Sequence, residues 1–247
     1  MEVWLEKESQ HYIFHFKKDS YASQFVDAVI LEQEQCFENI SRLLQTVPRE
    51  RIHYWLCDSQ KEVALKSKYG ECNGVTCCDD GVANIYCVYT ENVKCTGYHE
   101  DTHAIAYFYN DIHSNALAEG LAMYMDKTWW SIENELCTLV YIENGVYVSV
   151  EKMICGKNDV GEEYFLDIDD CYSYPIMGAF VAFLIEQQGT TSFLRLYGYK
   201  GMEWETEFAK IYGRSIPEAE NEFIYYIKSK EYTEPQKMAA YTRLCID

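Results

Sequence analysis

The feature that most constrains the fold is a long stretch of helical periodicity between two strand-like segments. Apolar residues in 21–44 recur at helical spacing: Phe25, Val26, Val29, Ile30, Phe37, Ile40, Leu43 and Leu44. This spacing predicts a long helix with one apolar face. Segment 11–16 alternates in part between polar and apolar residues, and it predicts a strand, as does 51–57. The chain therefore begins with a strand, a long helix and a second strand.

The rest of the chain contains further strand-like segments and then mostly helical ones. Segment 59–70 predicts a short helix with Ser59 as its N-cap and Gly70 just beyond its C-terminus, and turn residues dominate 71–81. The other expected elements are a strand at 82–90, helices at 97–110, 114–127 and near 131–142, a loop or hairpin around Asn144–Gly145, and helices at 175–188, 190–197, 203–212 and 216–229. Strands with helices first and mostly helices later are typical of an α+β fold.

Length and charge exclude several classes of protein. The 247 residues fit a single domain, which we divide into an N-terminal α/β lobe of about residues 1–110 and a helical lobe of about residues 111–247. Hydrophobic residues make up 48% of the chain, which is enough to form a buried core. The formal net charge of −19 argues against nucleic acid and anionic lipid as partners, because phosphate groups bind Lys and Arg.

The cysteines and the apolar segments predict a cytoplasmic protein. The 11 cysteines are odd in number and irregularly spaced, which favours reduced thiols over a disulfide scaffold. The first residues are charged from Glu2 onward, so we expect no signal peptide. The sequence contains no run of about 18 apolar residues, so we expect no membrane-spanning helix. The oligomeric state does not follow from these observations.

The most specific chemical signal is the pentapeptide HEDTH, which begins at His99 within the expected helix 97–110. Positions i and i+4 of a helix share one face, so His99 and His103 direct two imidazoles to one point. Zinc binds imidazole nitrogen and has three protein ligands in catalytic sites. Glu100 lies about 100° further around the helix, where its carboxylate can reach a water without being a ligand.

A metal explains this motif better than chance does. About 0.01–0.02 such motifs are expected by accident in a chain of this composition, and the alternative is a helix with two stacked surface histidines. The apolar flanks favour a metal, because buried polar groups need partners. We expect the third ligand to be Glu119 on the next helix. Its neighbours are apolar or small, and Gly120 leaves room for close helix approach, so a solvated carboxylate is the less favoured alternative.

The sequence HEDTH followed by AEGLAMY resembles the gluzincin-type zinc metallopeptidases, whose third ligand is a Glu on the helix after the motif. The order of elements over residues 10–228 is also similar to the peptidase-MA-like clan related to the M1 aminopeptidases. The resemblance implies a zincin-like catalytic domain in which His99, His103 and Glu119 bind one Zn²⁺. It implies hydrolysis of peptide or protein substrates by a metal-activated water, with Glu100 as general base.

Three features differ from better-known members. We find no segment like the one that holds a substrate amino terminus in aminopeptidases, so exopeptidase activity of that kind is not implied. Met123 stands where thermolysin-like enzymes have an aspartate that orients a ligand histidine. The chain also lacks an obvious domain for substrate specificity.

Other candidate residues have simpler alternative roles. Related enzymes stabilise the oxyanion with a Tyr or His on a later helix, so Tyr174 is the first candidate and Tyr172 the second. Packing is the alternative, since the chain contains 22 tyrosines. Strand 82–90 is a candidate sheet edge for an extended substrate, with core packing as the alternative. Asp111 and His113 are expected to be turn and surface residues, with contacts to the site as the alternative.

Two other functions stay open beside the enzyme. The first is a non-catalytic relative that keeps the fold and the metal site for binding or regulation. The second is an unrelated α+β protein with a chance motif. Retention of Glu100 argues against the first, because a site without catalysis has no use for a general base.

Overall fold

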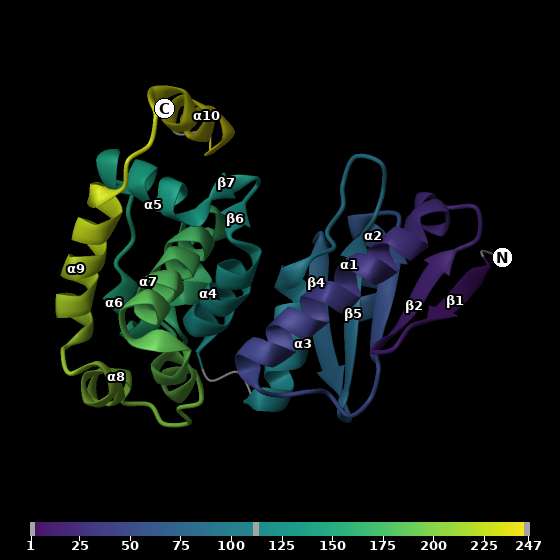
Figure 1. Ribbon diagram of the computed structural model, residues 1–247, viewed down its shortest axis with the longest axis horizontal. Helices are drawn as coiled ribbons and strands as arrows, with labels where there is room; N and C mark the ends of the chain where they lie inside the picture. Colours follow the sequence, from purple (N-terminus) through teal and green to yellow (C-terminus); the bar gives the residue numbers. More distant parts are fainter. Residues whose placement is uncertain (1–2, 111–113, 245–247) are drawn as a thin grey trace. The chain divides into compact units, whose positions relative to one another are not determined.

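The predicted α+β class is confirmed in a computed structural model, which describes residues 3–110 and 114–244 (Figure 1). The chain divides into two units, Met1–Asp111 and Ile112–Asp247. In its described residues the first unit contains a five-stranded sheet with three helices, and the second is mostly helical. None of the described helices combines the length and the apolar character needed to cross a membrane.

The sheet of the first unit is mixed. Its strands, in spatial order, are β1 (Trp4–Glu8), β2 (Tyr12–Lys17), β3 (Ile52–Cys57), β5 (Val82–Val88) and β4 (Gly74–Asp79). The three central strands are parallel to one another, whereas β1 and β4 pair antiparallel with β2 and β5. The antiparallel strands thus form both edges of the sheet.

The prediction that segment 82–90 forms an edge of the sheet is wrong. This segment forms β5, which hydrogen-bonds to β3 on one side and to β4 on the other. The edge is β4, within the stretch 71–81 that we expected to be turns. Its six residues, GVTCCD, include a glycine and an aspartate, which individually disfavour strands. Pairing with β5 overrides these local preferences.

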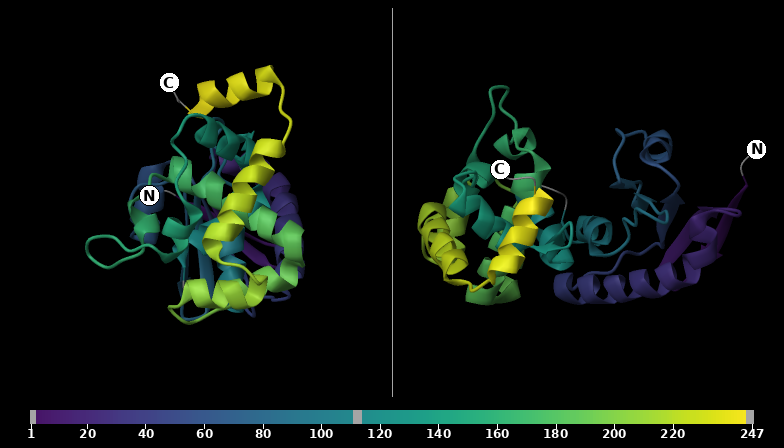
Figure 2. Two further views of the ribbon diagram at one scale, coloured as in Figure 1. Left: turned by 90° about the vertical axis from the view of Figure 1, so that its left-hand side faces the viewer. Right: turned by 90° about the horizontal axis from the view of Figure 1, so that it is seen from above.

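Helices cover both faces of the sheet. Helices α1 (Tyr21–Leu44) and α3 (Tyr98–Tyr109) cover one face, and α2 (Gln60–Ser67) lies on the other (Figure 2). Alternate residues of the central strands point towards α1 and are fully buried: Tyr12, Phe14, Ile52, Tyr54, Leu56, Ile85 and Cys87. The bounds of α1 agree with the predicted helix, and Ser59 caps α2 as predicted. The residue that ends α2 in left-handed conformation is Lys68 (φ 65°), and not Gly70.

On the face of α2, a histidine is buried in an unusual setting. The Nε2 atom of His15 lies 2.8 Å from Nδ1 of His53, and its ring stacks on Trp55 with centroids 3.8 Å apart. The Glu6 carboxylate lies 3.3 Å from its Nδ1 atom. Burial first, and then the neighbouring His53 and Lys66, lower the pKa of His15 to about 4, although Glu6 opposes them. The folded protein therefore holds this imidazole neutral.

We expect His15 to make the stability fall in mild acid. The unfolded chain protonates this histidine near pH 6.5 and the folded protein only near pH 4, so the unfolded state binds more protons in between. The stabilising contribution is complete above pH 6.5 and is lost towards pH 4, by about 3 kcal/mol. Urea unfolding of wild type and His15→Gln across this range measures it. The variant should show the shallower pH dependence, and equal slopes would contradict the assignment.

The second unit is built around α7 (Asp170–Tyr197). The other elements are α4 (Asn115–Asp126), β6 (Thr128–Trp129), β7 (Ile132–Glu133), α5 (Asn134–Glu143), α6 (Val150–Cys155), a 3₁₀ turn (Tyr164–Asp167), α8 (Trp204–Tyr212), α9 (Ile216–Ser229) and α10 (Glu234–Leu244). Helix α7 is interrupted at Gly189 (φ 78°, ψ 163°), which confirms the predicted break between two helices there. Of the loop or hairpin expected around Asn144–Gly145, the structure contains the loop, which connects α5 to α6.

Helix α4 is held closely against α7. A β-carbon at Gly120 of α4 would lie 2.9 Å from Cγ2 of Val181, and one at Gly178 of α7 would lie 2.6 Å from Cβ of Met123. Both distances are shorter than van der Waals contact. Glycine on each helix therefore permits the close approach of α4 and α7, a partner that the sequence analysis did not identify for Gly120.

A buried carboxylate joins α9 to α6. Glu220 is 7% exposed and accepts hydrogen bonds from the hydroxyls of Tyr147 (2.8 Å) and Ser149 (3.0 Å). It also accepts from the backbone N–H groups of Val150 (2.7 Å) and Glu151 (3.1 Å). The carboxylate thus lies at the N-terminus of α6, where the helix dipole favours negative charge.

Glu220→Gln should destabilise the protein markedly. The amide keeps the shape of the side chain but turns an NH₂ group towards donors that need an acceptor. We expect the free energy of unfolding to fall by about 2–4 kcal/mol in chemical denaturation. The control is Glu231→Gln at an exposed position, which should change it by less than about 0.5 kcal/mol. Similar losses in both variants would show that the four hydrogen bonds contribute little.

Candidate metal centre

The helix that carries HEDTH turns two of these residues to the core and three away from it. In α3 the side chains of Asp101 and Thr102 are buried, and the Thr102 hydroxyl donates to the Tyr98 carbonyl (2.7 Å). His99, Glu100 and His103 are only half-buried. The predicted helix is therefore confirmed, and its amphipathic rotation leaves the three candidate site residues half-buried.

The two motif histidines converge as predicted. Their Nε2 atoms lie 3.4 Å apart, and the ring planes are inclined by 77°. Two nitrogen ligands at the zinc–nitrogen distance and the tetrahedral angle are separated by about 3.3–3.4 Å. The spacing of the imidazoles thus fits two ligands of one tetrahedral ion.

The Glu100 carboxylate is directed at the edge strand β4. The Thr76 hydroxyl donates to its Oε2 atom (2.7 Å) and also lies 3.0 Å from the Glu100 backbone carbonyl. A β-carbon at Gly74 would lie only 2.6 Å from Oε1. Glycine at position 74 therefore provides the space that this carboxylate occupies. The sequence analysis missed both residues, because the contact requires a strand that it did not predict.

Asp101 points away from the histidines and into the core. Its Oδ2 atom accepts hydrogen bonds from the Tyr12 hydroxyl (2.9 Å) and the Gln33 amide (2.7 Å). Burial raises the pKa of Asp101 well above its usual value, although these two hydrogen bonds lower it. The two adjacent acidic residues of the motif thus have different environments.

The second unit carries the other predicted residues. Glu119 is half-buried on α4, a helix that begins at its N-cap Ser114 as predicted. Tyr174 packs between Trp129 (centroids 5.6 Å) and Phe165 (6.1 Å). The ring of Tyr172 packs edge-on against Tyr141. These ring contacts are those of packing, the alternative considered for both tyrosines, and the oxyanion role of Tyr174 stays a prediction. Asp111 and His113 lie outside the described residues.

One set of possible metal ligands is found among the described side chains. His99 and His103 of the first unit and Glu119 of the second each offer a ligand atom of a type that binds metal ions. Two imidazoles and one carboxylate are the ligand chemistry of zinc hydrolases. Met123 is fully buried against α7 and has no carboxylate to orient a histidine.

The thiols near Glu100 are poor ligands at neutral pH. Burial raises the pKa of Cys77, and Asp79 and Glu100 add to the effect. Burial, Cys77 and Asp79 raise the pKa of Cys78 to about 12. Metals bind the thiolate form, so Cys77 and Cys78 are weaker candidate ligands than the two imidazoles.

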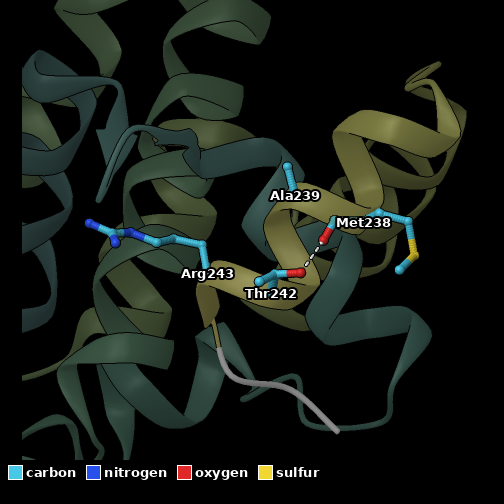
Figure 3. A pocket seen from close by; sticks show the side chains of 4 residues that line it. All are labelled: Met238, Ala239, Thr242 and Arg243. Carbon is cyan, nitrogen blue, oxygen red and sulfur yellow. Dashed lines mark hydrogen bonds between the residues drawn. The ribbon is translucent and has the colours of Figure 1, made fainter.

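A surface pocket of the second unit lies along α10 (Figure 3). Met238, Ala239, Thr242 and Arg243 line its volume of about 620 Å³. The lining includes neither a general base nor any residue of the predicted site.

Comparisons with known proteins add no family. No protein-family model matches the chain, and no curated protein matches it. The functional interpretation therefore depends on the geometry of the residues described above.

Proposed function

We propose that this chain is a zinc-dependent metallopeptidase of gluzincin type with a zincin-like fold. His99, His103 and Glu119 would bind one Zn²⁺, and Glu100 would be the general base. The observation that carries the proposal is the 3.4 Å separation of the two imidazole nitrogens, with a glutamate at the next position of the helix. The bound metal would supply a Lewis acid that lowers the pKa of a water and polarises a carbonyl.

The surroundings of Glu100 support a role in proton transfer. Thr76 occupies one carboxylate oxygen and holds the side chain against β4. The other oxygen faces the space left by Gly74. In the proposed reaction Glu100 takes a proton from the attacking water and delivers it to the leaving amine. A carboxylate held in a fixed orientation by a hydroxyl is suited to both steps.

The position of β4 supports an extended peptide as substrate. As the edge strand, it has one side paired with β5 and one side without a partner strand among the described residues. Main-chain groups of a peptide can pair with such an edge. Thr76 lies on this strand and contacts Glu100, so a peptide bound there would pass close to the general base.

The proposed partners and compartment are supported by composition alone. A net charge of −19 favours peptide or protein substrates over nucleic acid. The irregular set of 11 cysteines favours the cytoplasm, where thiols stay reduced.

The experiment compares wild type, Glu100→Gln and Glu119→Ala in metal analysis and in cleavage of a peptide library. Wild type should bind one zinc per chain and cleave peptides. Glu100→Gln should keep zinc and lose turnover by about 10²–10⁴-fold, since general-base catalysis contributes this much. Glu119→Ala should lose zinc affinity. Equal cleavage by wild type and Glu100→Gln would refute the role of Glu100. Zinc binding without cleavage would support the non-catalytic alternative, and absence of zinc binding would indicate a chance motif.

Gly74→Ala should reduce turnover without loss of zinc. The added methyl would displace the Glu100 carboxylate from Thr76, because its position lies 2.6 Å from Oε1. Misplacement of a catalytic group by about 1 Å lowers kcat by roughly 10²-fold. The matched control is Gly70→Ala, where no described atom lies within 4 Å of the added carbon. Equal kcat in both variants would mean that the space at Gly74 is irrelevant to the reaction.

A further inference from the structure

The motif helix begins in an unusual way. Its N-cap is Gly97 (φ 119°, ψ −149°), in a backbone conformation that favours glycine. Glycine has no side chain that could accept a hydrogen bond from the first N–H groups of the helix. The side-chain amide of Gln33 on α1 instead holds the backbone of Gly97 at the start of the helix. Its Nε2 atom donates to the Gly97 carbonyl (3.0 Å), and its Oε1 atom accepts from the Gly97 N–H (2.9 Å).

The same amide also reaches the first turn of the helix. Nε2 of Gln33 donates to Oδ2 of Asp101 (2.7 Å), which accepts a second hydrogen bond from the Tyr12 hydroxyl (2.9 Å). The side chains of Gln33, Asp101 and Tyr12 are all 0% exposed. One buried network therefore connects β2, α1 and the start of α3.

Stability alone does not explain this network. A buried carboxyl is costly, and well-packed apolar residues are often as stable or more stable in its place. No described residue donates to the Oδ1 atom of Asp101, so the group is only partly satisfied. What the hydrogen bonds provide is direction, because each one fixes the rotation of α3 about its axis.

This rotation determines where the metal ligands point. Asp101 lies two positions after His99 and two before His103, which is about 200° around the helix from each. It is thus on the opposite side of the same turns. A helix that rotates or frays at Gly97 would move both imidazoles and Glu100 together.

We propose that Gln33 and Asp101 are positioning residues that hold the first turn of α3 in the rotation required by the metal ligands His99 and His103. The effect on metal binding rests on the proposed function. The anchoring of α3 does not, because it is also a property of the metal-free chain. Supporting groups of this kind change metal affinity by about 10–100-fold in other metal sites.

The first test uses two substitutions of Asp101. Asp101→Asn can keep both hydrogen bonds, because its carbonyl can take the place of Oδ2 and its amide that of Oδ1. Asp101→Leu has the same number and branching of side-chain heavy atoms and keeps neither hydrogen bond. Zinc affinity, measured by competition with a chelating dye, should fall about 10-fold or more in Asp101→Leu and stay within about threefold of wild type in Asp101→Asn. Circular dichroism checks that both variants are folded. Wild-type affinity in a folded Asp101→Leu would overturn the proposal.

The second test needs no metal and no activity. Gln33→Met removes the amide at similar volume, and Gln35→Met on the exposed side of α1 is the matched control. In the metal-free protein, hydrogen exchange of the amides of residues 97–101 should become at least about tenfold faster in Gln33→Met only. Unchanged exchange would overturn the anchoring. If wild type binds no zinc but the exchange result holds, then the proposed function fails and the anchoring of α3 by Gln33 remains.

Discussion

The placement of α3 against the sheet is the constraint on which the candidate site depends. This helix of 12 residues has buried small and apolar residues in its centre, Ala104 to Ala106, and buried polar residues in its first turns. Apolar contact alone would allow it to slide or rotate by small amounts. Hydrogen bonds from Tyr12 and Gln33 to Asp101 remove this freedom, since they come from two other elements. The positions of His99 and His103 then follow from helix geometry.

The fold was predictable where the signal is local. The ends of α1 and α9 agree with the periodicity of the sequence, because both helices have a serine N-cap and several turns of amphipathic spacing. Strand β4 was missed, because its glycine and aspartate and the turn residues on both sides outweigh the strand preference of Val75 and Thr76. Its conformation comes from pairing with β5, and a pattern that considers one segment at a time does not contain this information. Lys68 in place of Gly70 at the end of α2 is a smaller failure of the same kind.

The candidate site shows the same division. The convergence of His99 and His103 is an i, i+4 property of one helix, so the sequence was sufficient to predict it. The partners of Glu100 were not predictable, since Thr76 and Gly74 come from the missed strand. Asp101 did carry a signal, because it is an acidic residue beside apolar flanks. The sequence analysis assigned it no role, and the buried carboxyl has partners in Tyr12 and Gln33.

The two neighbouring acidic residues show how one turn of helix can be both fixed and reactive. Glu100 is half-buried, receives one hydroxyl hydrogen bond and has its second oxygen in the space that glycine leaves at position 74, which suits the general-base role proposed for it. Asp101 is fully buried, and the same burial that raises its pKa removes it from solvent. The Asp101 carboxyl on the buried side of the helix would compete with Glu100 for a proton only if water reached it. Because the helix separates the two carboxyls by about 100°, the inner one can serve structure while the outer one stays free for chemistry.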